Sequence, residues 1–103
     1  MEPYTMNFTV EEQHMNAHGT CHGGFLYYFC NEAVAGACTA AGRAAVGANG
    51  SIHYYRPANL GDTLTATATL RKSGKRMGTY FVELTNSSGK LICDALFDVA
   101  YVD

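Results

Sequence analysis

The sequence has no excess of basic residues, and this lack excludes one broad class of partner. Only seven of the 103 residues are Lys or Arg, and the formal net charge is -2. A nucleic-acid-binding surface needs a basic patch or stripe to hold phosphates. We therefore expect no nucleic-acid partner.

The chain also has no long apolar run at its start, no C-x-x-C pair and no linker, repeat or low-complexity segment. Its first residues, MEPYTMNF, include an early acid, so we expect neither a signal peptide nor a membrane span. Two of the four cysteines, Cys30 and Cys38, fall within a predicted helix, where a disulfide framework is not expected. These absences predict a reduced, cytoplasmic protein in which residues 1–103 form a single domain.

The residues that are present are typical of a globular chain, with 48% hydrophobic and 16% charged. The stretch FLYYFCNEAVAGACTAA predicts one long helix over about 24–41, ended by Gly42. Strands are predicted over 5–10, 51–58, 63–70, 78–85 and 91–102, with tight turns at 72–75 and 86–90. This order predicts an α+β domain in which one antiparallel sheet is covered by one helix.

A single polar spot interrupts the apolar helix. Asn31 and Glu32 are its only amide and its only charge, and burying an unpaired polar group costs roughly 2–7 kcal/mol. At 100° per residue, Asn31 is expected to point almost directly away from the helix's own sheet, flanked by Tyr27, Ala35 and Cys38. Glu32 is expected about 100° further round. The two polar side chains of this apolar helix are therefore expected to have a bonding partner or a function.

The face of the helix opposite its sheet is also expected to be apolar, because Tyr27, Tyr28, Val34 and Ala35 all project there. A helix that is apolar all round is buried on both sides, and one sheet of this size covers only one side. A second copy of the chain is expected to cover the other side. The sequence thus predicts a homodimer.

The start of the same helix predicts the other half of a site. His22-Gly23-Gly24 leaves backbone N–H groups free at the positive end of the helix dipole, where they hold an anion or a carbonyl becoming an oxyanion. Asn31 lies about eight residues along, or roughly 12 Å at 1.5 Å per residue. Only a partner running antiparallel would bring the two together, so we expect a site shared across the dimer.

Two blocks of the sequence carry a family resemblance. HMNAHGTCHGG before the long helix, and SIHYYRPANLGDTLTATATLRKSGKR after it, closely resemble the hotdog-fold acyl-CoA thioesterases of the PaaI-like branch. The similarity extends over about 5–102. It implies a sheet wrapped around one long central helix, two chains paired into one long sheet, and dimers that pair again into tetramers.

The chemistry that the resemblance implies is hydrolysis of a small or medium acyl-CoA, without a metal or any cofactor beyond the CoA of the substrate. Gly23 would donate its N–H to the thioester carbonyl, and Asn16 would orient the attacking group or water. A carboxylate from the partner's helix would act as nucleophile or general base. His22, Gly24 and Tyr27 would lie along the bound substrate.

The sequence departs from the family at that carboxylate, whose position falls on Asn31. An amide holds a water molecule but cannot take its proton, and losing a general base typically costs ~10²–10⁴ in rate. Glu32 is the obvious substitute, although it points about 100° away. A serine of some relatives corresponds to Gly47. The alternative is therefore a protein that binds acyl-CoA or another acyl thioester without hydrolysing it.

Other polar groups leave further alternatives open. His14, His18, Cys21 and His22 have spacings that fit a zinc site, although the family uses no metal. His22 also leaves a hydratase-type hotdog enzyme open. Cys30 would be a nucleophile only with a base beside it, and a packed core thiol is the simpler interpretation.

Positive charge is concentrated in one predicted turn, RKSGKR, which holds Arg71, Lys72, Lys75 and Arg76. A basic turn near the mouth of the site would attract the phosphates of coenzyme A. A solvated turn explains the same residues equally well. Arg56 is a further candidate for the substrate, or for an ion pair with Asp62.

Overall fold

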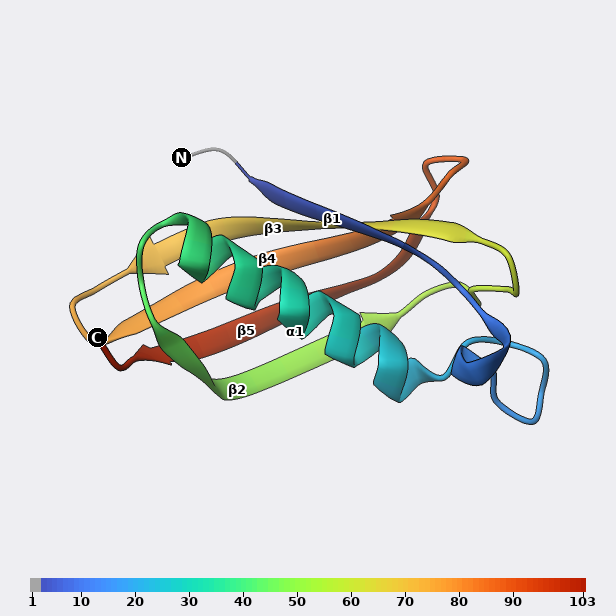
Figure 1. Cartoon of the computed structure of the whole chain (residues 1–103), viewed down its shortest axis with the longest axis horizontal. Coiled ribbons are helices and arrows are strands. Elements are labelled where there is room, and N and C mark those ends of the chain that lie inside the picture. The colour runs from blue at the N-terminus through green and yellow to red at the C-terminus, as the bar shows by residue number, and fades with distance from the viewer. Residues whose placement is uncertain (1–2) are drawn as a thin grey trace.

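The fold is a curved sheet of five strands with one long helix lying across its inner face, as Figure 1 shows for the computed structural model. Residues 3–103 are described. The strands are β1 (Tyr4–Thr9), β2 (Ala45–Tyr54), β3 (Thr63–Ser73), β4 (Met77–Asn86) and β5 (Leu91–Tyr101). The helix is α1 (Gly23–Ala40), and a short 3₁₀ helix, η1 (Glu12–His14), precedes it. The strand order is β1-β3-β4-β5-β2 with antiparallel neighbours, which confirms the predicted α+β hotdog arrangement.

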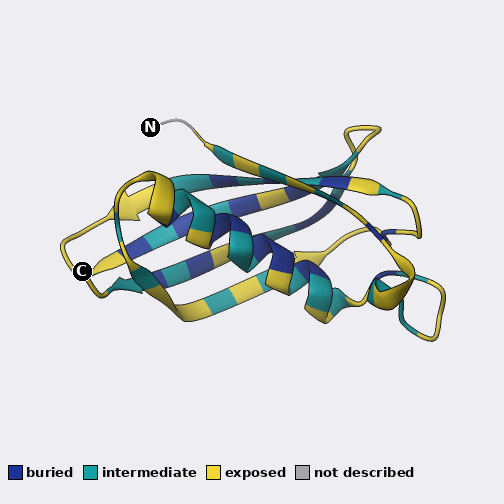
Figure 2. Cartoon of the chain, viewed as in Figure 1, coloured by how far each residue is buried: buried dark blue, intermediate teal, exposed yellow. Residues whose placement is uncertain are grey.

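Alternation along the strands places the core between the helix and the sheet. In β3, Leu64, Ala66 and Ala68 are buried against the helix, while the threonines between them lie on the outer face. Figure 2 shows this banding of buried and exposed residues along the inner strands. The buried side chains of these strands form the sheet's part of the core.

Strand β2 differs most from its prediction, because it runs from Ala45 to Tyr54 and not over 51–58. Gly47 and Gly50 are poor strand formers, so its first half gives no strand signal. The neighbouring β5 nevertheless pairs with it along its length, with a bulge between Gly47 and Asn49. β2 is an edge strand, so one of its two sides has no partner within the chain.

The buried face of the helix is wider than predicted on one side. Leu26, Phe29 and Cys30 are buried, and Val34 and Cys38 are buried as well, with 1% and 3% exposure. Both were expected on the far face, and that expectation was wrong. The curved sheet reaches further round the helix than a flat sheet would, so a wider stripe of α1 is covered.

All four cysteines, Cys21, Cys30, Cys38 and Cys93, are buried and free. Over residues 3–103, no helix has the length and apolar character needed to span a membrane.

Candidate functional site

The start of α1 presents two backbone N–H groups without acceptors. His22 is the N-cap, and its carbonyl accepts the N–H groups of Phe25 and Leu26, each at 3.1 Å. Within residues 3–103, the N–H groups of Gly23 and Gly24 have no hydrogen-bond acceptor. They lie at the positive end of the helix dipole. This end of the helix therefore has the donors that an oxyanion needs.

A cavity of about 330 Å³ opens beside these donors. Gly23, Leu26, Tyr54 and Arg56 belong to its lining. The structure therefore places Arg56 near the helix start, and its role towards the substrate stays a prediction. Within residues 3–103, Arg56 forms no ion pair with Asp62. The Asp62 Oδ2 accepts the N–H of Asn59 at 2.8 Å. Arg56 is exposed and places a positive charge at this cavity.

Tyr54 is a site residue that the sequence did not reveal. It ends β2, and its hydroxyl donates a hydrogen bond to the Gly23 carbonyl oxygen at 2.6 Å. Burial is the main cause that raises the pKa of Tyr54, and the nearby Cys93 and Cys30 thiols raise it further. The hydroxyl therefore stays protonated and can donate. The contact joins residues 31 positions apart. The only available signal was the tyrosine pair in SIHYYRPA.

Asn31 lies on the flank of α1 that faces β2, which corrects the expectation that it points directly away from the sheet. It is half-buried, and its Oδ1 would lie 4.0 Å from a Cβ placed on Gly47. One turn earlier, Tyr27 packs against the Phe97 ring, with 5.2 Å between ring centroids. Over residues 3–103, the Asn31 amide makes no hydrogen bond, so it is free to bind a ligand or a second copy.

Glu32 lies on the opposite flank of the helix, which faces β1. Phe25 and Gly36 occupy the same flank at helical spacing and contact Phe8 and Tyr4 of β1. The Glu32 carboxylate accepts a hydrogen bond from Tyr28 at 3.4 Å. Because α1 is one uninterrupted α-helix, no bulge turns Glu32 towards Asn31.

Asn31 and the helix start line different cavities within one chain. The cavity beside Asn31 has about 270 Å³ and is lined by Tyr27, Gly47, Gly50 and Phe97 among others. It shares no lining residue with the cavity at Gly23, and roughly 12 Å of helix separates the two groups. Both cavities include residues of β2, the edge strand. Within one chain, Asn31 and the helix start therefore do not meet in one cavity.

The apolar far face of the helix is smaller than predicted. Val34 is buried and Tyr27 is half-buried against Phe97, which leaves Tyr28, 55% exposed, and Ala35. The helix therefore gives less support to a second copy than its sequence suggested. The unpaired side of β2 gives new support, because an exposed strand edge is a template for pairing.

Asn16 uses its side chain to close its own turn. Its Oδ1 accepts the N–H groups of His18 and Thr20, at 2.9 and 3.1 Å, and its Nδ2 donates to the Thr20 hydroxyl at 2.9 Å. These bonds shape the loop that leads into α1. An orienting role for Asn16 towards water stays a prediction.

The zinc and thiol alternatives gain no support from the structure. Among residues 3–103, no three His, Cys, Asp or Glu side chains are grouped as a metal site would require. His14 stacks on Phe25, with ring centroids 3.9 Å apart, and its Nδ1 accepts the N–H of Glu11. Cys30 is buried, and a hydrogen bond with Cys93, followed by burial, raises the pKa of its thiol. It is a core thiol and a poor nucleophile.

The basic turn lies at the other end of the molecule from the helix start. Arg43, just after α1, donates through its Nη2 to the Lys75 carbonyl at 3.1 Å. The β3–β4 turn and the C-terminal end of α1 therefore lie together (Figure 1). Lys72, Lys75 and Arg76 are exposed there. Within one chain, the structure does not bring these residues to Gly23.

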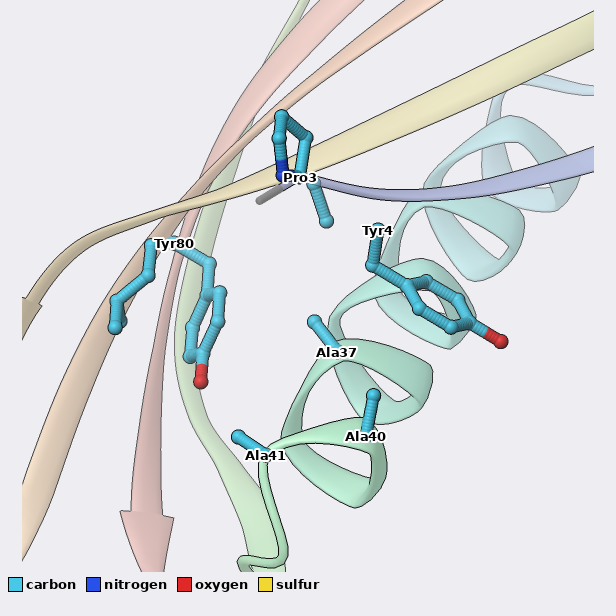
Figure 3. A pocket seen from close by; sticks show the side chains of 8 residues that line it. Pro3, Tyr4, Ala37, Ala40, Ala41 and Tyr80 are labelled. Carbon is cyan, nitrogen blue, oxygen red and sulfur yellow. The ribbon is translucent and has the colours of Figure 1, made fainter. Parts of the chain in front are cut away.

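A third cavity, of about 440 Å³, lies under the last turns of α1 (Figure 3). Ala37, Ala40 and Ala41 leave this space because their side chains are short, and Tyr4 and Tyr80 stand on either side of it. The pKa of Tyr80 is raised, chiefly by burial. Among the described residues, its lining offers apolar surface and two tyrosines, and no carboxylate, imidazole or thiol.

Comparison with known proteins gives consistent matches. A family model described as the thioesterase superfamily matches residues 18–93. Acyl-coenzyme A thioesterase PaaI of Escherichia coli strain K12 is 44% identical over 92 residues, which are 89% of this chain and 64% of that protein. Acyl-coenzyme A thioesterase 13 of Homo sapiens is 41% identical over 86 residues, covering 81% of this chain and 61% of that protein.

The fold matches equally well. The structure of the E. coli PaaI protein from the phenylacetic acid degradation operon superposes with a TM-score of 0.92 at 37% identity. The match covers 96% of this chain and 72% of that one. The chain spans less than two thirds of the length of either curated relative.

Proposed function

Because the chain belongs to the thioesterase superfamily, in its PaaI-like branch, we propose that it hydrolyses small or medium acyl-CoA thioesters in a site built by two copies. One observation carries this proposal. Gly23, whose N–H group is free like that of the adjacent Gly24, and Asn31, whose amide is free, line separate cavities along the same edge strand. The reaction needs water and the acyl-CoA, and no metal or further cofactor.

An antiparallel pairing of β2 with β2 of a second copy would join the two halves. The first cavity lies at Tyr54, near the end of β2, and the second lies at 47–50. A two-fold axis near Ser51 sets Tyr54 of one copy opposite Ala48 of the other, because opposed residue numbers in such a pair have a constant sum. The helix start of each copy then faces Asn31 of the other.

The chemistry follows from the groups that meet. The thioester carbonyl oxygen lies between the N–H groups of Gly23 and Gly24, which stabilise the negative charge it gains. The Asn31 amide oxygen of the second copy holds a water molecule that attacks the carbonyl carbon. The C–S bond then breaks, coenzyme A leaves as a thiolate, and the proton of the water passes to solvent. The acid product leaves with the new oxygen.

Substrate recognition is divided between the two cavities. Arg56 attracts the negatively charged coenzyme at the helix start, where His22 also lies, and the basic turn of the second copy adds positive charge at the same end of the pair. Tyr27 and Phe97 give the second cavity aromatic walls for the acyl group. Its volume of about 270 Å³ fits a small or medium acyl group.

Asn31 itself favours a second candidate function, which is binding of acyl-CoA without hydrolysis. An amide accepts a hydrogen bond from water but takes no proton, so this site lacks a general base. A slow thioesterase and a binding protein share every other feature of the site. Only turnover distinguishes the two functions.

A thiol-release assay over a panel of aliphatic and aromatic acyl-CoAs, paired with calorimetric titration of coenzyme A, tests the proposal. Turnover of at least one substrate that exceeds the rate in a protein-free control is expected. Binding of coenzyme A without turnover of any thioester, by either the wild type or Asn31→Asp, contradicts hydrolysis and leaves the binding function. Absence of both binding and turnover contradicts both functions.

A further inference from the structure

The contact between Tyr54 and the helix start affects the two glycines, Gly23 and Gly24, differently. A Cβ added to Gly23 would lie 3.1 Å from the Tyr54 Cζ and 3.2 Å from its hydroxyl oxygen. A Cβ added to Gly24 would meet nothing within 4 Å. A Cβ at Gly23 would therefore press closely on the tyrosine ring, whereas Gly24 leaves open space in front of its backbone. The two glycines have different tasks.

The hydrogen bond from Tyr54 acts on the peptide group that holds one of the free donors. The carbonyl of Gly23 and the N–H of Gly24 belong to one planar, trans peptide, in which they point in opposite directions. Fixing the carbonyl oxygen at 2.6 Å from the hydroxyl therefore fixes the direction of the Gly24 N–H. A hydrogen bond to a carbonyl also polarises its peptide and strengthens the N–H on the other side as a donor.

The position of Tyr54 allows this action without contact to the reacting atoms. The residue ends β2, and the cavity that it lines also includes Gly23 and Arg56. Its ring packs against Gly23, so the hydroxyl is held by packing as well as by the bond. Preorganised donors contribute most when they need no rearrangement during the reaction.

We propose that Tyr54 is a positioning residue for hydrolysis, whose hydroxyl holds the Gly23–Gly24 peptide so that the Gly24 N–H is aimed at the thioester carbonyl oxygen. The inference rests on the proposed thioesterase function. Tyr54 acts through the helix start and touches neither the attacking water nor the leaving sulfur. Its effect belongs to the transition state, where the oxygen carries charge, and not to ground-state binding.

Tyr54→Phe tests the role because it keeps the ring and removes only the hydroxyl. We expect kcat to fall roughly tenfold with KM within about twofold, a smaller loss than the ~10²–10³ seen when an oxyanion donor itself is removed. The amide proton of Gly24 should move upfield in NMR spectra, while that of Gly89, at a distant turn, stays unchanged. Tyr101→Phe is the matched control, because it removes a hydroxyl bonded to Ser73 at 2.9 Å and should leave kcat unchanged.

The outcomes separate this inference from the function it rests on. A wild type that hydrolyses no thioester overturns the proposed function, and the catalytic role of Tyr54 with it. An active wild type whose kcat and Gly24 shift survive Tyr54→Phe overturns only the role of Tyr54. A fall in melting temperature together with an unchanged Gly24 shift shows a purely structural tyrosine and also contradicts the inference.

Discussion

At the scale of single residues, the proposed rate of hydrolysis depends on which of two neighbours, Asn31 or Glu32, faces the cavity beside Gly47. Asn31 faces β2 and the cavity beside Gly47, whereas Glu32 shares its flank with Phe25 and Gly36 and faces β1. The two side chains are neighbours in sequence and about 100° apart on the helix. We therefore expect that the Glu32 carboxylate does not take the place of the family carboxylate, whose position is occupied by Asn31.

Asn31→Asp should raise kcat for acyl-CoA hydrolysis by about 10²–10⁴, because it adds a general base to a site that already has its oxyanion donors. The wild-type rate should rise steadily with pH, since hydroxide is its only strong nucleophile. The variant rate should instead level off above the pKa of the new carboxyl. Thiol-release kinetics from pH 4 to 9 measure both. An unchanged rate in the variant would contradict the placement of Asn31 beside the thioester.

Glu32→Gln should change kcat by less than about twofold in the same assay, because the side chain lies on the wrong flank. Glu32→Gln removes a charge and keeps the side-chain shape, whereas Asn31→Asp adds a charge and keeps the shape. Loss of activity in Glu32→Gln would identify Glu32 as the base and reverse the assignment of the two residues.

Sequence reasoning predicted part of the candidate site and missed part for a physical reason. Gly23 and Arg56 were predicted because a glycine-rich helix start and a lone arginine carry their own chemical signal, and the structure places both at one cavity. Tyr54 was missed because its function depends on a contact with a carbonyl 31 residues earlier. The direction of Asn31 was misjudged because helical spacing fixes angles along the helix but not the curvature of the sheet around it.

At the scale of elements, β2 is the part that sequence reasoning placed least well. The other strands and the helix follow from alternation and from apolar runs, whereas the first half of β2 contains Gly47 and Gly50. Its strand conformation is imposed by pairing with β5. Gly50 also has a packing role, because a Cβ there would lie 2.8 Å from the Phe97 ring and would clash with the Tyr27 hydroxyl.

Gly50→Ala should therefore destabilise the protein by about 1–3 kcal/mol, the usual effect of overpacking. It should also lower kcat, because Tyr27 lies one helical turn before Asn31. Urea unfolding measures the stability change. Gly74→Ala is the control, since its Cβ would make only an ordinary contact at 3.6 Å with the Met77 carbonyl. Equal stability of the two variants would contradict the close packing of β2 against Phe97.

At the scale of the whole molecule, the basic turn and the start of α1 lie at opposite ends of the long axis. The basic turn lies at the C-terminal end of α1, and the oxyanion donors lie at its N-terminal end. Only a second copy in the reverse direction brings the two to one end. The position of the turn and the position of Asn31 thus independently support the proposed head-to-tail pair.

Replacing Lys72, Lys75 and Arg76 together by Gln should raise KM for acyl-CoA several-fold and reduce its dependence on salt, because the phosphates lose their counter-charges. Hydrolysis of an acyl thioester of N-acetylcysteamine, which has no phosphate, should be unchanged. Steady-state kinetics at low and high salt give both values. An unchanged KM for acyl-CoA would leave the turn as a solvated loop.

The most direct test of the shared site is complementation between two inactive chains. Gly24→Val blocks the helix start without a clash, since nothing lies within 4 Å of its Cβ, and Asn31→Ala removes the amide. Mixed after reversible dissociation, the two variants should recover about a quarter of the wild-type rate, because half of the dimers are mixed and each mixed dimer has one intact site of two. If mass spectrometry shows the mixed dimers and the rate stays at the sum of the separate variants, the site is not shared and the account is wrong.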